Sequence, residues 1–505
     1  MINNRLAICV ILCGASIFAP GDRLAAADWP QYMGPTGSLA SVTPGVVLAG
    51  DPAIWRHLWT SEERGLGCGK NWSQYPQPNM APDRPLPGGL ASPVLAEGLI
   101  HLHYFQPKEG PLATGYHNYK AGAPAQAHYR ILAEDVDVAI DAATGRTVWK
   151  RTGGEPGLNL FTTKRGGWGV TGCVHEGRYF ALDTLGRVLA YDAKTGKPLW
   201  QAGDAAGART EREAAVGQHR FAKMFLAGHL AVIGGHVIAP QYGGRLIALD
   251  PASGAERWTW KGDIAQFASA AFRAGVGRDL ALVPGFKGVT CLDPANGAVL
   301  WHLDGPLQDF LTTYQDVFLF VDCGKEAFVK DKDKDRTNAR WALYRARPEG
   351  PELVWRSTVM TGCGSDGGPQ RRAPIDGVLA YLPGTLETTP PLSQYTDTTV
   401  VDLKTGAVVF HKKTALGGPD AKSGMHVAVR WDNLLLSRCE ADSSGVRCVR
   451  TATGEGLGRY SIWDGLGHFH YGYQTVTLDA YGDGIAYVRH LYHGGCIQAW
   501  DLRAR

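Results

Sequence analysis

Large polar, cationic and aromatic side chains recur in a series of loops along the chain, and their types suit the binding of a polar or anionic ligand. Arginine and lysine attract anions, histidine exchanges protons near neutral pH, and tryptophan and tyrosine supply apolar walls. We expect the following residues to share one ligand-binding funnel: Trp168, His219, Arg220, Lys223, Gln266, Gln308, Asp309, Arg371, Arg372, His426, His468, His470 and Tyr471.

Histidines also gather near the two ends of the chain. His101 and His103 alternate along one expected strand and so share a face, which would suit a metal ion or an acid/base pair. No carboxylate has a spacing that would complete such a site, and packing between sheets is the interpretation that we favour.

Other groups that could bind a metal ion are weaker candidates. The run 330–336 (KDKDKDR) has alternating aspartates but lacks the glycine and the later glutamate of a calcium-binding loop, so we interpret it as a solvated hairpin tip. The cysteines show neither a C-x-x-C motif nor an adjacent pair, which argues against a zinc site. Cys439 and Cys448 could form a disulfide across one hairpin or remain buried thiols.

A repeated segment indicates which elements position these residues. Aspartate precedes glycine by four residues, and glycine precedes an aromatic residue by four, in segments 138–149, 188–200, 246–258, 289–301 and 400–410. Alternating apolar residues before the aspartate predict a half-buried strand, the aspartate can accept turn amides, and the glycine allows positive φ. Each segment is therefore a β-hairpin that ends in an aromatic residue.

A second strand pair precedes each hairpin, as in segments 92–105, 170–182 and 373–384, which gives four strands per repeat. A four-stranded antiparallel repeat of this length is typical of a propeller blade. We expect an all-β, eight-bladed β-propeller over 28–505, and the funnel residues to lie in the loops that lead into the innermost strands. Such residues could instead hold ordered water in the central channel.

The blade count depends on how the ring closes. The closing aromatics Trp149, Trp200, Trp258, Trp301, Trp355, Phe410 and, more weakly, Tyr460 account for seven blades, while the last unit ends before its outer strand. The segment 54–59 (IWRHLW) stands alone near the start of the chain, and as the outer strand of the last blade it would remove two sheet edges. A seven-bladed ring is the alternative.

The repeat D-x-x-T-G-x-x-x-W resembles that of quinoprotein alcohol dehydrogenases and of outer-membrane assembly scaffold lipoproteins. The opening 28–38 (DWPQYMGPTGS) is similar to the start of exported PQQ-binding-like β-propeller repeat proteins. The resemblance implies the propeller fold, but that fold carries unrelated activities. Blade one is longer than the others, and we interpret about 106–130 as an insertion over one face, with a connector as the alternative.

The first 27 residues have the layout of a signal peptide, with Arg5, an apolar run and the small residues before Asp28. We expect cleavage after Ala27 and a periplasmic or extracellular protein, with lipidation at Cys13 as the less favoured route. The net charge of +3 implies no nucleic-acid partner, and no other apolar run is long enough to span a membrane.

These features leave three functions open. The first is a monomeric, non-catalytic module or scaffold that binds a protein, a peptide or a cell-surface polymer. The second is a dehydrogenase of alcohols or sugars that depends on pyrroloquinoline quinone (PQQ), with calcium as its metal ion. Against it, this sequence lacks the adjacent cysteines of the family that it resembles, and it has no C-x-x-C-H haem motif. The third is a polysaccharide lyase or hydrolase, suggested by the His- and Tyr-rich segments 115–120 and 468–473.

Overall fold

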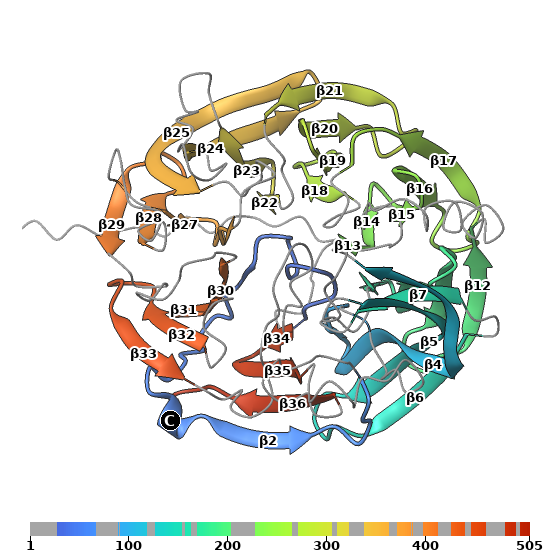
Figure 1. Ribbon diagram of the computed structural model, residues 1–505. Coiled ribbons are helices and arrows are strands. Elements are labelled where there is room, and N and C mark those ends of the chain that lie inside the picture. Colours follow the sequence, from blue (N-terminus) through green and yellow to red (C-terminus); the bar gives the residue numbers. More distant parts are fainter. Residues whose placement is uncertain are drawn as a thin grey trace, which may run out of the picture.

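The computed structural model describes residues 28–66, 89, 91–118, 127–153, 157–162, 169–203, 228–264, 271–305, 311–322, 338–362, 371–384, 386, 397–412, 426–439, 446–460, 480–490 and 495–505. Within these ranges the chain forms small antiparallel sheets arranged as a ring around a central channel (Figure 1). The sheets are the eight blades of a β-propeller, so the predicted fold is confirmed and the seven-bladed alternative is wrong.

The first four blades follow one another in sequence, each with its innermost strand first. Their strands are β3 Val94–Ala96, β4 Leu99–Asn118, β5 Ala127–Asp141 and β6 Thr147–Thr152; β9 Cys173–His175, β10 Arg178–Leu182, β11 Val188–Asp192 and β12 Pro198–Ala202; β14 Ala231–Ile233, β15 His236–Gln241, β16 Arg245–Leu249 and β17 Glu256–Lys261; and β18 Phe272–Ala274, β19 Leu280–Gly285, β20 Gly288–Leu292 and β21 Val299–Asp304.

Blades five to eight keep this order with two departures. The inner strand of blade six is reduced to a bridge between Ile375 and Ala380, and blade eight takes its outer strand from elsewhere in the chain. The strands are β22 Thr312–Tyr314, β23 Val317–Asp322, β24 Asn338–Arg347 and β25 Gly350–Gly362; β27 Leu379–Pro383, β28 Thr398–Asp402 and β29 Val408–Lys412; β30 His426–Trp431, β31 Leu434–Cys439, β32 Val446–Arg450 and β33 Gly456–Tyr460; and β34 Ala480–Gly482, β35 Ile485–His490 and β36 Cys496–Asp501.

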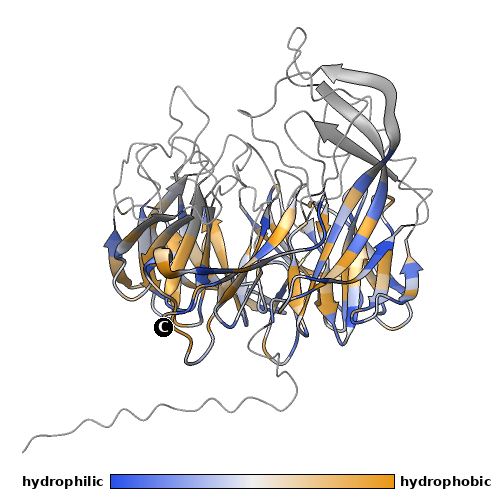
Figure 2. Ribbon diagram, turned by 90° about the horizontal axis from the view of Figure 1, so that it is seen from below, coloured by the Kyte–Doolittle hydropathy of each residue, from blue (hydrophilic) through white to orange (hydrophobic). Residues whose placement is uncertain are grey.

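The antiparallel order of the strands gives the disc two different faces. The repeat hairpins join third to fourth strands, and they lie at the same end of each blade as the turns between first and second strands; we call this the lower face. The fourth strands end, and the next innermost strands begin, at the opposite, upper face; Figure 2 shows the disc from its side. We expect the predicted funnel residues to lie in the connections between these strand ends, most of which are outside the described ranges.

The repeat aspartate closes each lower hairpin as expected from the sequence. Asp192 Oδ1 accepts hydrogen bonds from the backbone N–H and the hydroxyl of Thr195, at 2.8 and 2.7 Å, and Asp402 does the same with Thr405. The hydroxyl and backbone hydrogen bonds from these threonines lower the pKa of both carboxyl groups.

The repeat glycine and the closing tryptophan form the contact between neighbouring blades. Trp149 lies on Gly196 of the next blade, where a Cβ would come within 2.5 Å of the indole, and its Nε1–H donates to Ala193 O at 2.8 Å. Trp258 and Gly297 repeat the arrangement. Positive φ is therefore only half of the reason for the glycine, since its missing side chain also makes room for the preceding blade.

A strand from the start of the chain closes the ring. β2 Arg56–Thr60 pairs with β36 as the outer strand of blade eight, which confirms the predicted closure (Figure 1). The strand begins two residues later than we predicted, because Pro52–Ile54 forms a single 3-10 turn, η1. Trp59 takes the place of the missing closing aromatic: its ring lies on Gly145 of blade one, and its indole donates to Ala142 O at 3.2 Å.

The insertion in blade one is part of its sheet. β4 and β5 remain paired beyond the level of the other blades, out to Asn118 and Ala127, and β7 Gly157–Thr162 adds a further strand against β5. Because the second and third strands of each blade join at the upper end, this extension lies at the upper face. The residues between 118 and 127 lie outside the described ranges.

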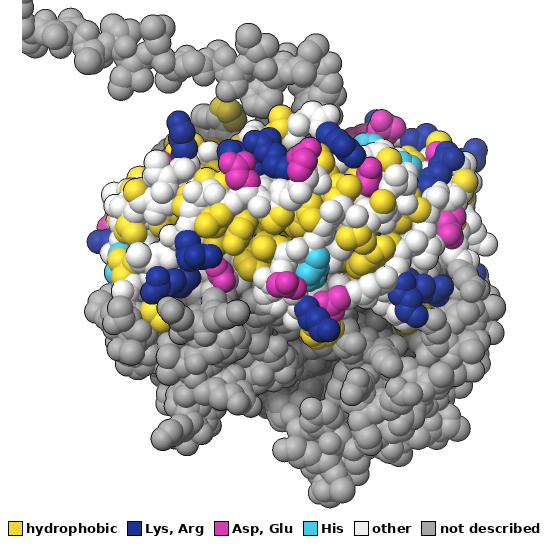
Figure 3. All heavy atoms as spheres, turned by 90° about the horizontal axis from the view of Figure 1, so that it is seen from above, with side chains coloured by type: hydrophobic (Ala, Val, Ile, Leu, Met, Phe, Trp, Pro, Cys, Tyr) yellow, Lys and Arg dark blue, Asp and Glu magenta, His cyan; other side chains and the backbone are white. Residues whose placement is uncertain are grey.

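The outer wall of the disc is formed by the fourth strands. On β6 the closing aromatic Trp149 is 6% exposed, whereas its neighbour Val148 is 47% exposed. Figure 3 views the wall around β21 and β25, where apolar surface lies between charged side chains. Among the described residues, no helix has the length and apolar character needed to cross a membrane.

Candidate functional site at the upper mouth of the channel

Within the residues that the structure describes, neighbouring blades pair at the upper ends of their innermost strands in two places. Between blades two and three, β8 Val170–Thr171 runs parallel to β13 Gly228–His229. Between blades six and seven, β26 Arg371–Arg372 runs parallel to the start of β30, with Arg371 opposite His426 and Arg372 opposite Val427. The second junction thus brings three of the predicted funnel residues together on adjacent strands.

The remaining funnel residues lie outside the described ranges, so their grouping stays a prediction: Trp168, His219, Arg220, Lys223, Gln266, Gln308, Asp309, His468, His470 and Tyr471. The aspartate run 330–336 lies outside them as well. For Arg371, Arg372 and His426 the backbone position is described and the side chain is not.

The central channel below this mouth is filled by the chain itself. Residues 29–41, which we call the plug, cross the centre of the ring (Figure 1). They contact seven successive blades at or next to their inner strands. Trp29 exchanges two backbone hydrogen bonds with Leu95 of blade one, at 2.8 and 2.9 Å. At the other end, β1 Ala40–Ser41 pairs in parallel with β30 of blade seven. Pattern reasoning from the sequence did not find this segment.

The plug also engages a histidine that the sequence analysis missed. His229, 3% exposed, stacks on the ring of Tyr32 at 5.2 Å and lies 4.8 Å from Phe272 of blade four. Its Nε2 lies 3.0 Å from Ala271 O. His229 lies opposite Thr171 in the β8–β13 pair. A polar residue just before the innermost strand of both blades is the sequence feature that could have indicated this position.

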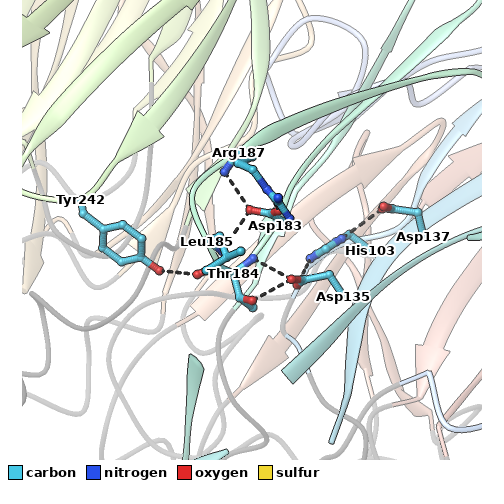
Figure 4. A network of polar contacts seen from close by, with 8 residues as sticks. All are labelled: His103, Asp135, Asp137, Asp183, Thr184, Leu185, Arg187 and Tyr242. Atoms are coloured by element: carbon cyan, nitrogen blue, oxygen red, sulfur yellow. Dashed lines mark hydrogen bonds and ion pairs between the residues drawn. The ribbon is translucent and has the colours of Figure 1, made fainter. Parts of the chain in front are cut away.

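A buried polar network lies between blades one and two, at the base of the blade-one extension (Figure 4). His103 is 3% exposed, with Nδ1 3.0 Å from Asp137 Oδ1 and Nε2 3.4 Å from Asp135 Oδ1. Burial would lower the pKa of His103, but the two carboxylates outweigh it and raise this pKa to about 10. His103 is therefore a buried cation held between two acids.

The network continues into blades two and three. Asp135 Oδ2 accepts hydrogen bonds from the backbone N–H and hydroxyl of Thr184, at 3.0 and 2.7 Å, and Tyr242 donates its hydroxyl proton to Thr184 O at 3.0 Å. Burial and the charge of Asp135 raise the pKa of the adjacent Asp183 to about 6, although Arg187 opposes them. These contacts pin the upper ends of three blades together (Figure 4).

His101 has the opposite environment, although it is only two residues away on the same strand. Its ring stacks on Tyr179 at 4.9 Å and lies 5.7 Å from Trp149, and no described residue hydrogen-bonds to either ring nitrogen. Burial lowers the pKa of His101 to about 3, so the ring is neutral. This side chain packs between blades, which agrees with the interpretation that we favoured from the sequence.

Comparison with known proteins agrees with this architecture. The family model described as "Outer membrane protein assembly factor BamB" matches residues 133–334. The quinohemoprotein alcohol dehydrogenase of Comamonas testosteroni is similar in structure over 95% of this chain and 81% of its own, with a TM-score of 0.51 and 12% identity. The chain has the fold of a PQQ-like β-propeller.

Two further solved structures are similar to this chain. Quinohemoprotein alcohol dehydrogenase ADHIIG of Pseudomonas putida HK5 matches 95% of this propeller and 81% of its own chain, with a TM-score of 0.50 and 13% identity. BamB of Moraxella catarrhalis matches 73% of this chain and 89% of its own, with a TM-score of 0.44 and 12% identity. A search among curated protein sequences found no match.

The described residues of this PQQ-like propeller do not fit a calcium-bound quinone. In the part of the chain that the structure describes, no three His, Cys, Asp or Glu side chains come together in a way that could hold a metal ion. Of the carboxylates beside the extension, Asp135 contacts His103 and Thr184, and Asp137 contacts His103. The sequence has no adjacent cysteines to pack on the cofactor.

The cysteines of the propeller are thiols where the structure describes them. Cys173, Cys291, Cys448 and Cys496 are buried and free. In the β31–β32 hairpin Cys448 lies opposite Leu436 rather than Cys439, so the disulfide that we considered between Cys439 and Cys448 is wrong. Its partner position was misjudged because the sequence alone does not give the register of that hairpin.

Proposed function

We propose that this PQQ-like propeller is an exported, non-catalytic module that binds a protein, peptide or cell-surface polymer at its upper face. The observation that carries the proposal is the pairing of β26 with β30, which sets Arg371, Arg372 and His426 on neighbouring strands at the mouth of a channel filled below by the plug. Two arginines and a histidine at one junction, above a channel that the plug crosses, suit an anionic ligand that rests on the disc rather than passing through it.

The family comparison supports an envelope role. The matching model is that of an outer membrane protein assembly factor, and its range, 133–334, runs from within β5 of blade one to beyond β23 of blade five. It includes Asp135 and Asp137 of the polar network but not His103. A scaffold of this kind presents a rigid face to its partner, and the pinned upper ends of blades one to three supply such rigidity.

Export is the part of the proposal that rests on the first 27 residues. Their signal-peptide layout and the small residues before Asp28 favour cleavage after Ala27. Trp29 is hydrogen-bonded to Leu95 in the fold, so the expected cleavage point lies two residues before a residue that belongs to the propeller. Periplasmic or extracellular placement follows from that signal.

The experiment compares envelope partners captured by the purified wild type, by the charge-reversed variant Arg371→Glu/Arg372→Glu, and by Leu199→Glu on the outer wall. Leu199 is 43% exposed on β12 and is the matched surface control. We expect the wild type and Leu199→Glu to retain the same cross-linked partner and the double variant to lose at least about tenfold of it. Equal capture by all three proteins contradicts the proposal.

A PQQ-dependent dehydrogenase is the second candidate, since the quinohemoprotein structures cover 95% of this chain. Asp309, Asp366, Arg371 and Arg372 supply the charge types that such a site uses. Incubation of the mature protein with PQQ and calcium separates the candidates. A retained quinone absorbance with reduction of an artificial electron acceptor favours the dehydrogenase, whereas absence of both favours the binding module.

A further inference from the structure

The innermost strands of a propeller each have one edge that faces the channel, and the N–H groups on that edge need acceptors. In this ring the plug supplies them. Backbone N–H groups of six inner-strand or adjoining residues donate to plug carbonyls at 2.8 to 3.3 Å: Leu95 to Trp29, Val174 to Pro30, Thr313 to Gly37, Ile375 to Ser38, Arg430 to Leu39 and Asp432 to Ser41.

The side chains of the plug are buried in sites formed by the ring. Trp29, Met33 and Leu39 are 0% exposed. Trp29 packs in the apolar cluster of blades one and eight, and Met33 and Leu39 pack with Phe272 of blade four. Backbone capture by the ring amides is independent of sequence, whereas these apolar contacts select particular side chains.

The plug is compact by its own hydrogen bonds. Gly34 N–H donates to Gln31 O at 3.2 Å, and Leu39 N–H donates to Met33 O at 3.0 Å. Gly34 has a φ of +86°, and a Cβ at this position would lie 2.9 Å from the Trp29 ring. The plug is therefore held in a compact turn by its own hydrogen bonds, as well as by the ring.

Only a short exposed turn connects the plug to the rest of the ring. Val46 N–H donates to Thr43 O at 3.1 Å, Pro44 and Gly45 are exposed, and a Cβ on Gly45 would meet no atom within 4 Å. Beyond this turn Ala49 pairs with Leu502 of the C-terminal segment. The plug and the closing strand are thus separate units along the chain.

We propose that the lower channel is a peptide-binding site, which this protein fills with its own residues 29–41. The ligand class is a short, turn-forming peptide with an aromatic residue near its start and two buried aliphatic residues, whose carbonyls are captured by the ring amides. This site is distinct from the upper mouth, and the inference stands whether or not the upper face binds a partner.

The test cuts the turn in the intact, folded protein. A protease recognition sequence is inserted between Pro44 and Gly45, the purified protein is cleaved, and the products are separated by gel filtration at micromolar concentration and weighed by mass spectrometry. We expect the fragment ending at the cut to remain with the ring. Release of the fragment from a ring that keeps its circular dichroism spectrum overturns the proposal.

Exchange with a synthetic, fluorescently labelled peptide of residues 28–44 then measures affinity. We expect the peptide to replace the cut fragment, and Trp29→Ala or Leu39→Asp in the peptide to weaken its binding at least about 100-fold, because each side chain is fully buried. A scrambled peptide is the control. Equal exchange of the native and scrambled peptides overturns the proposal.

A second measurement uses the uncut chain, so it does not depend on whether the cleaved protein stays folded. In the Trp29→Ala/Leu39→Asp variant we expect the amides of Val174, Ile375 and Arg430 to exchange with solvent deuterium at least about tenfold faster, with the amides of outer strand β12 unchanged. Unchanged exchange at the inner amides would show that the plug does not occupy them, and would overturn the proposal.

Discussion

The indole of Trp59 lies on Gly145 in the same way as Trp149 lies on Gly196, although Trp59 belongs to the last blade and precedes blade one in the chain. A Cβ on Gly145 would come within 2.6 Å of the Trp59 ring, compared with 2.5 Å for Gly196 and Trp149. The junction that closes the ring is therefore built like the internal ones.

This equivalence predicts how much stability is lost when a side chain is added at Gly145. Gly145→Ala adds a methyl group against the Trp59 ring at a φ of +75°, and we expect the free energy of unfolding to fall by about 3 kcal/mol, from strain at positive φ and overpacking together. Gly98→Ala in the same blade is the control, since Gly98 has a φ of +76° and no atom near a Cβ. Its cost should be about 1 kcal/mol. Urea unfolding measures both, and equal costs would contradict the packing argument.

A double-mutant cycle tests the contact itself. Trp59→Ala removes the ring, and we expect it to cost about 2–4 kcal/mol because the closing junction loses its aromatic contact and a hydrogen bond to Ala142. In the Trp59→Ala background, Gly145→Ala should cost only as much as Gly98→Ala does, since its methyl group has room. Additive effects of the two substitutions would show that Trp59 and Gly145 do not touch.

The buried cation His103 predicts a loss of stability at alkaline pH. Its pKa is raised from about 6.5 to about 10 in the fold, so its contribution is complete below pH 6.5 and lost as the pH rises to about 10. At pH 6.5 we expect His103→Gln to cost about 3 kcal/mol, because the substitution leaves Asp135 and Asp137 without their cation. The difference from the wild type in urea unfolding should shrink between pH 7 and 10.

His101→Gln is the matched control for this pH dependence. His101 is neutral in the fold, with a pKa lowered to about 3 by burial, and it is also neutral in the unfolded chain above pH 6.5. Its cost should therefore show no trend between pH 7 and 10. A trend equal to that of His103→Gln would remove the ion pair as the cause.

Burial also predicts that the thiols of Cys173 and Cys291 are unreactive in the native protein. It raises the pKa of Cys173 and of Cys291 to about 12, so little reactive thiolate forms at pH 8. We expect Cys173→Ala and Cys291→Ala to leave the number of thiols titrated in the native protein unchanged. In urea each substitution should remove one thiol from the titration. A native count that falls in either variant would show that the thiol is accessible.

The propeller could be predicted from the sequence because its repeat is local. Asp192, Thr195, Gly196 and Trp200 lie within nine residues, and together they specify a turn, a positive φ and a junction. The closing strand could be predicted because the last unit of the chain ends before its outer strand, whereas the segment 54–59 near the start of the chain has no hairpin partner. The plug could not, since residues 29–41 have no periodicity and their partners are spread from Leu95 to Asp432.

The candidate site was harder to predict for the same reason. The register of Arg371 against His426 depends on a parallel pairing between two blades, and nothing in either local sequence specifies it. His103 and Asp137 face each other because β4 and β5 are cross-strand partners, which the sequence suggested for the strands but not for their alignment.

The plug has a consequence for how the ring loses its structure. Repeat proteins usually pass stability only from each unit to its neighbour, so that one end can melt while the other persists. Here the plug contacts seven blades at or next to their inner strands, and the chain continues from it into β2, which completes the eighth blade. A disturbance in any blade therefore reaches blades on the far side without travelling around the rim, and the disc should unfold as one cooperative unit.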